Sequence, residues 1–150
     1  IGLMIPCIGI VLILILSGPD QKNCMSEIEK ILVVEDNDFV RMQIVKYLND
    51  AGYGTYEAAE GDSALDEISK STDVSLAIVD VRMEPVGGFE FIKAIRGREI
   101  ETPVVLVTGD QTPDLLERAG QCGVSAVLMK PVEKDRLLKT VERTLGAVKR

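Results

Sequence analysis

The chain has 150 residues and a mass of 16.4 kDa, which is the usual size of one domain. Its net charge of −7 disfavours DNA or RNA binding, because an acidic protein repels the phosphate backbone. The absence of histidine excludes a Ser-His-Asp triad, a histidine-ligated zinc site and a phosphohistidine carrier on this chain. Three cysteines without a CxxC pair exclude a disulfide scaffold and indicate a reducing, cytoplasmic location.

The first segment, Ile1–Leu16, is apolar and carries no charge. As a helix it would be about 24 Å long, shorter than the ~30 Å hydrocarbon core of a bilayer. It lacks the positive charges of a secretory signal, and Met25 resembles a natural start. We therefore expect residues 1–25 to be an apolar leader outside the fold and residues 26–150 to form the domain. The alternatives for the leader are a non-native extension, a membrane anchor and a packing arm, and only the anchor would imply membrane contact.

Five short apolar runs follow and predict five β-strands. Four of them are nearly continuous in Val, Ile, Leu and Ala, which is typical of parallel strands buried on both faces. The second run alternates with polar residues, so we place it at an edge of the sheet. The predicted strands are Ile31–Val34, Gly54–Ala58, Val74–Val79, Val104–Val107 and Val124–Met129.

An amphipathic helix is predicted after each strand. The apolar stripe of the first helix consists of Val40, Ile44, Tyr47 and Leu48. The predicted helices are Asp38–Asn49, Asp62–Ser69, Phe89–Arg96, Asp114–Gln121 and Glu133–Leu145. Five strand–helix repeats indicate an α/β, doubly wound (βα)5 domain, with helices on both faces of a five-stranded parallel sheet.

Polar side chains follow four of the five predicted strands, at the edge where ligands bind in sheets of this class. In strand order they are Glu35 and Asp36, then Asp80, Thr108 and Lys130. Each has an ordinary interpretation, and Asp36 or Asp38 would serve equally well as the cap of the first helix. Their placement at one edge of the sheet favours a shared site instead.

Three carboxylates in one pocket would repel each other by about 1 to 4 kcal/mol for each pair at 4 Å, so such a cluster indicates a bound cation. Oxygen ligands with few protein donors suit Mg²⁺, which keeps several waters and helps to neutralise a phosphoryl group. Lys130 would add a second positive charge and Thr108 a hydroxyl. The adjacent Gly109 leaves room for an anionic group to approach.

With these residues in place, residues 28–148 resemble the receiver domain of bacterial two-component response regulators, and in particular a single-domain chemotaxis regulator. The matching stretches are Ile31–Asp36, Ala77–Met83, Gly88-Phe89, Val107–Gly109 and Lys130-Pro131. The resemblance implies the flavodoxin-like strand order 2-1-3-4-5. It also implies a function in phosphorelay signal transduction.

The site that the resemblance implies has three kinds of residue. Asp80 is the phosphoacceptor. The Mg²⁺ ligands are Glu35, Asp36, Asp80 and the backbone carbonyl of Arg82. The residues at the phosphoryl group are Thr108, Gly109, Lys130 and Pro131, and the resemblance implies a cis peptide bond between the last two.

Two positions depart from the family pattern. Val127 stands where the family usually has Tyr or Phe, three positions before Lys130. A coupled threonine–aromatic switch therefore cannot operate in its usual form. Pro85 lies one position later than usual in the loop after Asp80, which alters how the loop covers the site.

The expected function is to take a phosphoryl group from a histidine kinase or a histidine phosphotransfer protein onto Asp80 and to switch contacts with a downstream protein target. Beyond this self-catalysed transfer and hydrolysis, the chain is not expected to be an enzyme. The donor histidine must come from another chain, because this one has none. Phe39, Met42 and Val45 fall off the buried stripe of the first helix and are candidates for kinase docking.

Three alternatives remain from the residues alone. A phosphorylation-independent interaction module of the same fold is compatible with Val127. A flavodoxin-like cofactor binder is less compatible, because Glu35 and Asp36 would repel the phosphate of FMN. A phosphatase with an aspartyl nucleophile would need a second Asp where Arg82 stands.

Overall fold

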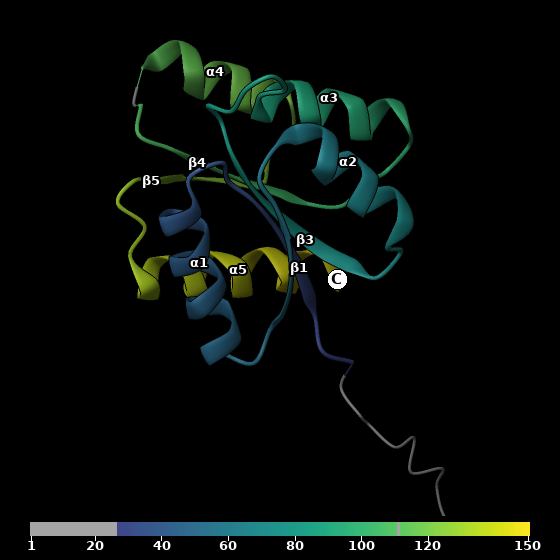
Figure 1. Cartoon of the computed structure of the whole chain (residues 1–150), viewed down its shortest axis with the longest axis vertical. Helices are drawn as coiled ribbons and strands as arrows, with labels where there is room; N and C mark the ends of the chain where they lie inside the picture. The colour runs from purple at the N-terminus through teal and green to yellow at the C-terminus, as the bar shows by residue number, and fades with distance from the viewer. Residues whose placement is uncertain (1–26, 111) are drawn as a thin grey trace, which may run out of the picture.

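Strands and helices alternate through the part of the chain that the structure, a computed structural model, describes: residues 27–110 and 112–150 (Figure 1). The strands are β1 (Lys30–Val34), β2 (Gly54–Ala58), β3 (Val74–Asp80), β4 (Val104–Thr108) and β5 (Ala126–Met129). The helices are α1 (Asp38–Asp50), α2 (Gly61–Lys70), α3 (Gly88–Gly97), α4 (Pro113–Gln121) and α5 (Lys134–Val148). Every predicted element is present, with ends that differ by at most a few residues. The predicted leader, residues 1–25, lies outside the described residues.

The five strands form one parallel sheet in the order β2-β1-β3-β4-β5, which confirms the expected topology. At the centre of the sheet Val34 pairs with Val79, and Val79 pairs with Leu106. The carboxyl ends of β1, β3 and β4 therefore lie next to one another. The prediction that β5 is buried on both faces is wrong, because β5 is an edge strand in which Leu128 alone is fully buried.

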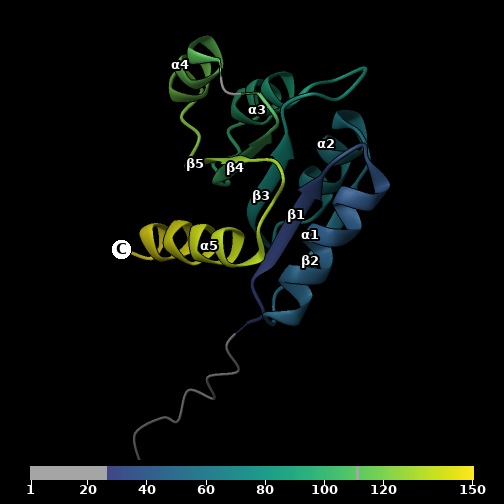
Figure 2. The same ribbon diagram turned by 90° about the vertical axis from the view of Figure 1, so that its left-hand side faces the viewer.

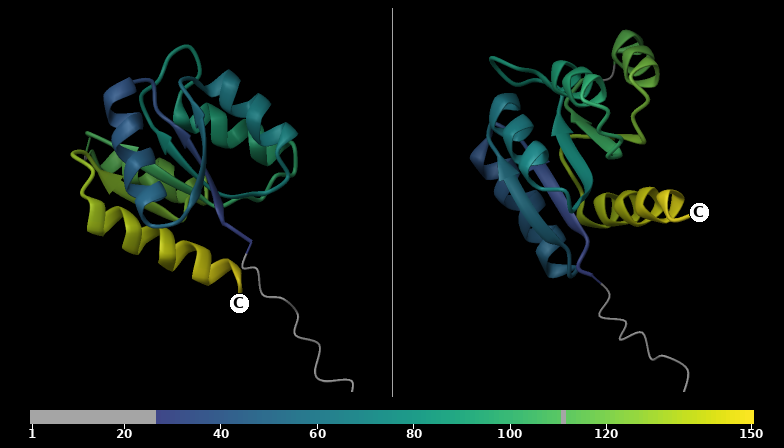
Figure 3. Two further views of the ribbon diagram at one scale, coloured as in Figure 1. Left: turned by 60° about the horizontal axis from the view of Figure 1, so that its bottom comes forward. Right: turned by 90° about the vertical axis from the view of Figure 1, so that its right-hand side faces the viewer.

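Helices cover both faces of the sheet. Figure 1 shows α2, α3 and α4 above the strands and α1 and α5 below them, and Figures 2 and 3 show α5 opposite α3 and α4 from other sides. The alternation of side chains along each strand fills both cores. Along β1, Leu32 and Val34 pack with α2, α3 and α4, whereas Ile31 and Val33 pack with α1 and α5.

The first helix begins directly after the strand-end acids and is fixed by a capping side chain. The Oδ1 atom of Asn37 accepts a hydrogen bond from the backbone N–H of Val40 at 3.1 Å. The predicted caps, Asp36 and Asp38, do not fill this position. Asn and Asp are about equally good caps, so composition alone did not decide among three consecutive candidates. Because Asn37 caps the helix, the carboxylate of Asp36 is not used as a cap and lies near the end of β1.

None of the helices in residues 27–110 and 112–150 has the length and apolar character needed to cross a membrane.

Candidate functional site

Three carboxylates meet at the carboxyl ends of β1 and β3. Glu35 and Asp36 directly follow β1, and Asp80 is the last residue of β3. Each contributes an oxygen to a group in which all the atoms lie within 4.8 Å of one another. Glu35 and Asp80 are only 1% and 4% exposed, whereas Asp36 is open to solvent. The structure thus brings together the three acids that the sequence placed at this edge.

Lys130, which follows β5, reaches into this carboxylate cluster. Its Nζ lies 2.9 Å from Oε2 of Glu35 and 3.3 Å from Oδ2 of Asp80. The peptide bond between Lys130 and Pro131 is cis, as the resemblance implied. With all three carboxylates ionised, one ammonium leaves the cluster with a formal charge of −2.

Burial dominates the pKa of Glu35, whereas ion pairing dominates the pKa of Lys130. Burial raises the pKa of Glu35, and repulsion from Asp80 adds to this effect, while the ammonium of Lys130 opposes it without cancelling it. Burial by itself lowers the pKa of Lys130, but its pairing with Glu35 and Asp80 outweighs burial, so the net pKa is raised. Lys130 therefore stays a cation at neutral pH.

The backbone around Glu35 is held from three directions. Its N–H donates to the carbonyl of Ala58 on β2 at 3.1 Å, and its own carbonyl accepts from Nη1 of Arg41 at 2.8 Å. The N–H of Asn37 donates to Oε1 of Glu35 at 3.2 Å. Arg41 was not predicted as part of the site, although it lies one turn into the helix that follows the acids. Arg41 holds the backbone from which the Glu35 side chain extends, and the N–H of Asn37 contacts the carboxylate itself.

The donor set fits a hard divalent cation. Oε2 of Glu35 is buried and receives no directed hydrogen bond, because Lys130 approaches it at short distance but outside hydrogen-bonding angles. Lys130 supplies one positive charge to this oxygen, but with all three carboxylates ionised the cluster still carries a formal charge of −2, which a divalent cation would neutralise. Carboxylate oxygens are the ligands that Mg²⁺ prefers, and few protein ligands leave space for its waters. The residues present therefore suit Mg²⁺.

Thr108 and Gly109 stand beside this cluster at the end of β4, the neighbour of β3. Thr108 is buried, and its Oγ1 accepts a hydrogen bond from the backbone N–H of Asp110 at 3.0 Å. At Gly109 no atom of the described residues lies within 4 Å of the position that a Cβ would occupy. Space for an incoming group, expected from the glycine, is thus available at this rim.

A glycine also sets the backbone path on the other side of Asp80. A Cβ at Gly88, the first residue of α3, would lie 2.5 Å from the carbonyl oxygen of Asp80. The start of α3 therefore packs directly against the backbone of the central acid. Gly88 is part of a stretch that supported the family resemblance, and close approach is the physical reason for a glycine there.

The loop after Asp80 is tied to the loop after Thr108 by an ion pair that was not predicted. Nη2 of Arg82 lies 2.6 Å from Oδ2 of Asp110. Each residue stands two positions beyond a residue of the site. Both loops follow strands that end at the same edge of the sheet, but no signal in the sequence singles out these two charges among the others there.

The candidate docking residues on α1 divide into two groups. Phe39 and Met42 are 73% and 64% exposed, in agreement with the helical-wheel prediction. The prediction for Val45 is wrong, because Val45 is half-buried and packs against the core beneath α1. A helix covering an edge of a sheet buries a wider stripe than its most apolar residues define.

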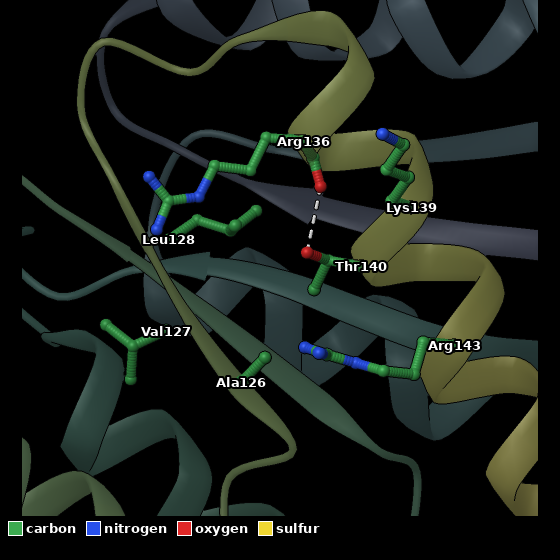
Figure 4. A pocket seen from close by; sticks show the side chains of 7 residues that line it. All are labelled: Ala126, Val127, Leu128, Arg136, Lys139, Thr140 and Arg143. Carbon is green, nitrogen blue, oxygen red and sulfur yellow. Dashed lines mark hydrogen bonds between the residues drawn. The ribbon is translucent and has the colours of Figure 1, made fainter.

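The position of the family aromatic lies on β5. Val127 packs toward the α2–α4 side of the sheet, whereas Ala126 and Leu128 face α5 (Figure 4). Between β5 and α5 is a hollow of about 360 Å³, whose polar lining includes Arg136, Lys139 and Arg143. None of the strand-end site residues lines it, so this hollow is separate from the carboxylate cluster.

Similarity to known proteins supports one family. Residues 31–142 match the model described as the response regulator receiver domain. The chain is 33% identical over 115 residues to the CAI-1 autoinducer sensor kinase/phosphatase CqsS of Vibrio cholerae, covering 75% of this chain and 17% of that protein. It is 27% identical over 117 residues to sporulation initiation phosphotransferase F of Bacillus subtilis, covering 78% of this chain and 94% of that protein.

Among solved structures, the chemotaxis protein CheY4 of Vibrio cholerae aligns with a TM-score of 0.74 and 34% identity, covering 78% of this chain and 98% of that one. Several curated relatives are much longer, and this chain spans less than two thirds of their length. The similarity thus concerns the described fold and its site, and not the further parts of those proteins.

Proposed function

Because this chain belongs to the response regulator receiver domain family of two-component systems, we propose that it accepts a phosphoryl group on Asp80. One observation carries the proposal: Asp80 is a buried strand-end carboxylate that faces both a lysine and two further acids. Of the three acids, it is the one whose neighbouring strand ends in a hydroxyl and an open glycine.

In the proposed transfer, a carboxylate oxygen of Asp80 attacks the phosphorus of a phosphohistidine. The oxygen–phosphorus bond forms as the phosphorus–nitrogen bond breaks, and the imidazole nitrogen keeps the electron pair of the broken bond. The donor histidine lies outside this sequence, which contains none. In the later hydrolysis, water attacks the phosphorus and the oxygen of Asp80 leaves as a carboxylate.

Two residues of the chain respond to the added charge. Lys130, now 3.3 Å from Oδ2 of Asp80, is close enough to pair with a phosphoryl oxygen attached to that carboxylate. Thr108 offers a hydroxyl from the adjacent strand end, and the open space at Gly109 admits the phosphoryl group beside it. These contacts would stabilise the product and bias the chain toward a second conformation.

The proposed metal ligands are the carboxylates of Glu35, Asp36 and Asp80 and the backbone carbonyl of Arg82. When bound there, Mg²⁺ supplies positive charge that offsets the charge of the transferring phosphoryl group. The cluster's formal charge of −2, which remains after pairing with Lys130, supports this assignment. Glu35 is held in place for this role by Asn37 and Arg41.

The donor is proposed to be a histidine kinase or a histidine phosphotransfer protein that docks on α1. Phe39 and Met42 expose apolar side chains on the helix that begins next to the carboxylate cluster. A partner seated there would bring its phosphohistidine to the same rim of the sheet. The downstream target is a further protein, whose contacts would follow the phosphorylation state of Asp80.

A direct test uses a small phosphodonor. Incubation with acetyl phosphate and Mg²⁺ should add the mass of one phosphoryl group to the wild-type chain and to Asp66→Asn, which changes an exposed aspartate on α2. Asp80→Asn should gain no mass, and chelation of the metal should prevent labelling of the wild type. Equal labelling of Asp80→Asn and Asp66→Asn would contradict the proposal.

Docking is tested with a protein donor instead. The double variant Phe39→Ser/Met42→Ser should slow phosphotransfer from a phosphorylated histidine phosphotransfer protein and leave acetyl phosphate labelling unchanged. Val148→Ser, an equally exposed apolar position at the end of α5, should transfer at the wild-type rate. If the double variant accepts the phosphoryl group at the wild-type rate, the donor protein does not dock on Phe39 and Met42.

A further inference from the structure

The Arg82–Asp110 ion pair joins the two loops that border the proposed phosphorylation site, and the proposed chemistry assigns it no role. We propose that Arg82 is a phosphoryl-binding residue, which leaves Asp110 and pairs with the phosphoryl group when Asp80 is phosphorylated. This inference rests on the proposed function of Asp80. It adds a second cation to the site and gives the site a connection to α4.

Arg82 is rooted beside the phosphoacceptor. Its backbone N–H lies 3.4 Å from Oδ1 of Asp80, so its side chain starts at the same rim. That side chain is 77% exposed, and its one ion pair with the described residues is the contact to Asp110. An exposed arginine held by a single carboxylate is free to exchange partners, because such surface pairs contribute little to stability.

Asp110 holds three different groups at once. Its Oδ2 pairs with Nη2 of Arg82 at 2.6 Å, and its Oδ1 accepts from the N–H of Thr112 at 3.1 Å. Its own N–H donates to Oγ1 of Thr108 at 3.0 Å. Thr112 is in turn the cap of α4, where its hydroxyl accepts from the N–H of Leu115 at 3.4 Å. The guanidinium, the site hydroxyl and the first turn of α4 are thus linked through one residue.

Space for the exchange exists at the same place. A hollow of about 360 Å³ is lined by Arg82, Gly109 and Asp110. Within residues 27–110 and 112–150, no atom lies within 4 Å of the Cβ position of Gly109. The guanidinium therefore borders open volume at the edge of the site, and packed side chains do not block its movement.

The balance of charge sets the direction of the exchange. Before transfer, Lys130 already pairs with the buried acids, and the single carboxylate of Asp110 is the partner of Arg82. Transfer places a doubly charged group with three acceptor oxygens on Asp80. A planar guanidinium binds phosphate oxygens in a forked geometry that a single lysine ammonium does not provide. The phosphoryl group is therefore the stronger partner for Arg82.

The exchange would carry the signal to α4. Once Arg82 leaves, Asp110 loses its cation while it still holds Thr112, and the loop before α4 can rearrange. This route needs no aromatic side chain on β5, where Val127 makes the usual coupling unavailable. Phosphorylation would then be read at the first turn of α4.

The test measures binding of fluoroberyllate, a stable mimic of a phosphoryl group on aspartate, in the presence of Mg²⁺ by titration calorimetry. Arg82→Ala should weaken binding about tenfold, the effect of losing one charge-assisted hydrogen bond. Asp110→Asn should instead tighten binding severalfold, because it removes the carboxylate that competes for Arg82. Arg98→Ala, which changes an exposed arginine just after the end of α3 that donates to Ser69 on α2, should match the wild type.

If the ion pair were only structural, Arg82→Ala and Asp110→Asn would change the fluoroberyllate affinity in the same direction. Exchange predicts that the affinity falls in the first variant and rises in the second. In the Arg82→Ala background, Asp110→Asn should have no further effect. The amide resonance of Thr112 should shift on fluoroberyllate binding in the wild type and should not shift in Arg82→Ala. Unchanged affinity in Arg82→Ala, or weakening by both substitutions, would overturn the exchange while leaving the phosphoacceptor proposal intact. A wild-type chain that binds no fluoroberyllate would contradict the proposed function itself.

Discussion

Lys130 holds together a cluster that would otherwise be three uncompensated acids, so its replacement tests the electrostatics of the site. Lys130→Met keeps the length of the side chain and removes its charge. In metal-free solution this leaves Glu35 and Asp80 buried without a cation. We expect a loss of about 3 kcal/mol in the free energy of unfolding, which is typical of breaking a buried ion pair.

The magnitude follows from the distances. At 2.9 Å and 3.3 Å, the two attractions amount to about 1.4 and 1.3 kcal/mol in the dielectric of water. They are about four times larger at the effective dielectric constant of a protein site. The side chain of Lys130 is 27% exposed, and the side chains of Glu35 and Asp80 are 2% and 5% exposed. The attraction at this half-open site therefore lies between the value in water and the value in a protein interior, and the cost of desolvation reduces the net loss to about 3 kcal/mol.

Urea unfolding in the presence of a chelator measures this loss. Lys139→Met, on an exposed part of α5, is the matched control and should lose less than about 0.5 kcal/mol. Adding Glu35→Gln to Lys130→Met should recover at least half of the loss, because one buried charge is removed. A loss below about 1 kcal/mol, or no recovery in the double variant, would refute the electrostatic reasoning.

Three further predictions concern the frame of the site. Burial raises the pKa of Glu35 above its usual 4.5, so the unfolded chain releases this proton first as the pH rises. The free energy of unfolding of the metal-free wild type should therefore fall relative to that of Glu35→Gln as the pH rises above about 4.5. A difference between the two free energies that does not change with pH, measured by urea unfolding, would contradict the raised pKa. Asn37→Ala should lower stability by about 1 kcal/mol through loss of the α1 cap, whereas Asp66→Ala on α2 should not. Gly88→Ala should cost about 2 kcal/mol because its Cβ meets the carbonyl of Asp80, and a melting temperature no lower than that of Gly97→Ala, where nothing lies within 4 Å, would argue against that clash.

The α/β class and the gathering of the strand-end acids could be predicted from periodicity and from the geometry of parallel sheets, whereas the strand order came from the family resemblance. Buried apolar runs defined the strands, and strand ends in a parallel sheet share one edge. Glu35, Asp36 and Asp80 therefore met as expected, and Lys130 lies beside Glu35 and Asp80. The chemical roles of these residues rest on family resemblance and on the tests above.

Features that depend on the direction of a side chain could not be predicted from the sequence. Asn37 caps α1 although its neighbours Asp36 and Asp38 are equally good caps, because backbone direction at the end of β1 decides which oxygen faces the helix. Val45 is half-buried because α1 lies over the sheet at an angle that a helical wheel does not contain.

Contacts between segments that only the tertiary fold brings together could not be predicted either. Arg41 contacts the carbonyl of Glu35 only because α1 folds back beside β1. The Arg82–Asp110 pair joins two loops 28 residues apart. Its charges are visible in the sequence, but many acids and bases follow strands, and only the structure selects which of them meet.

The residue that carries the phosphoryl group decides whether the carboxylate cluster is a phosphorylation site. Phosphoramidate, which like phosphohistidine carries its phosphorus on nitrogen, should label the chain in Mg²⁺, and borohydride should then reduce the acyl phosphate to homoserine at that residue. Peptide mass mapping should locate homoserine at position 80, with no homoserine at another aspartate and no 5-hydroxynorvaline, the reduced form of a phosphorylated glutamate, at any glutamate. Either product at another carboxylate, or full labelling without homoserine at position 80, would contradict the proposed role of the carboxylate cluster.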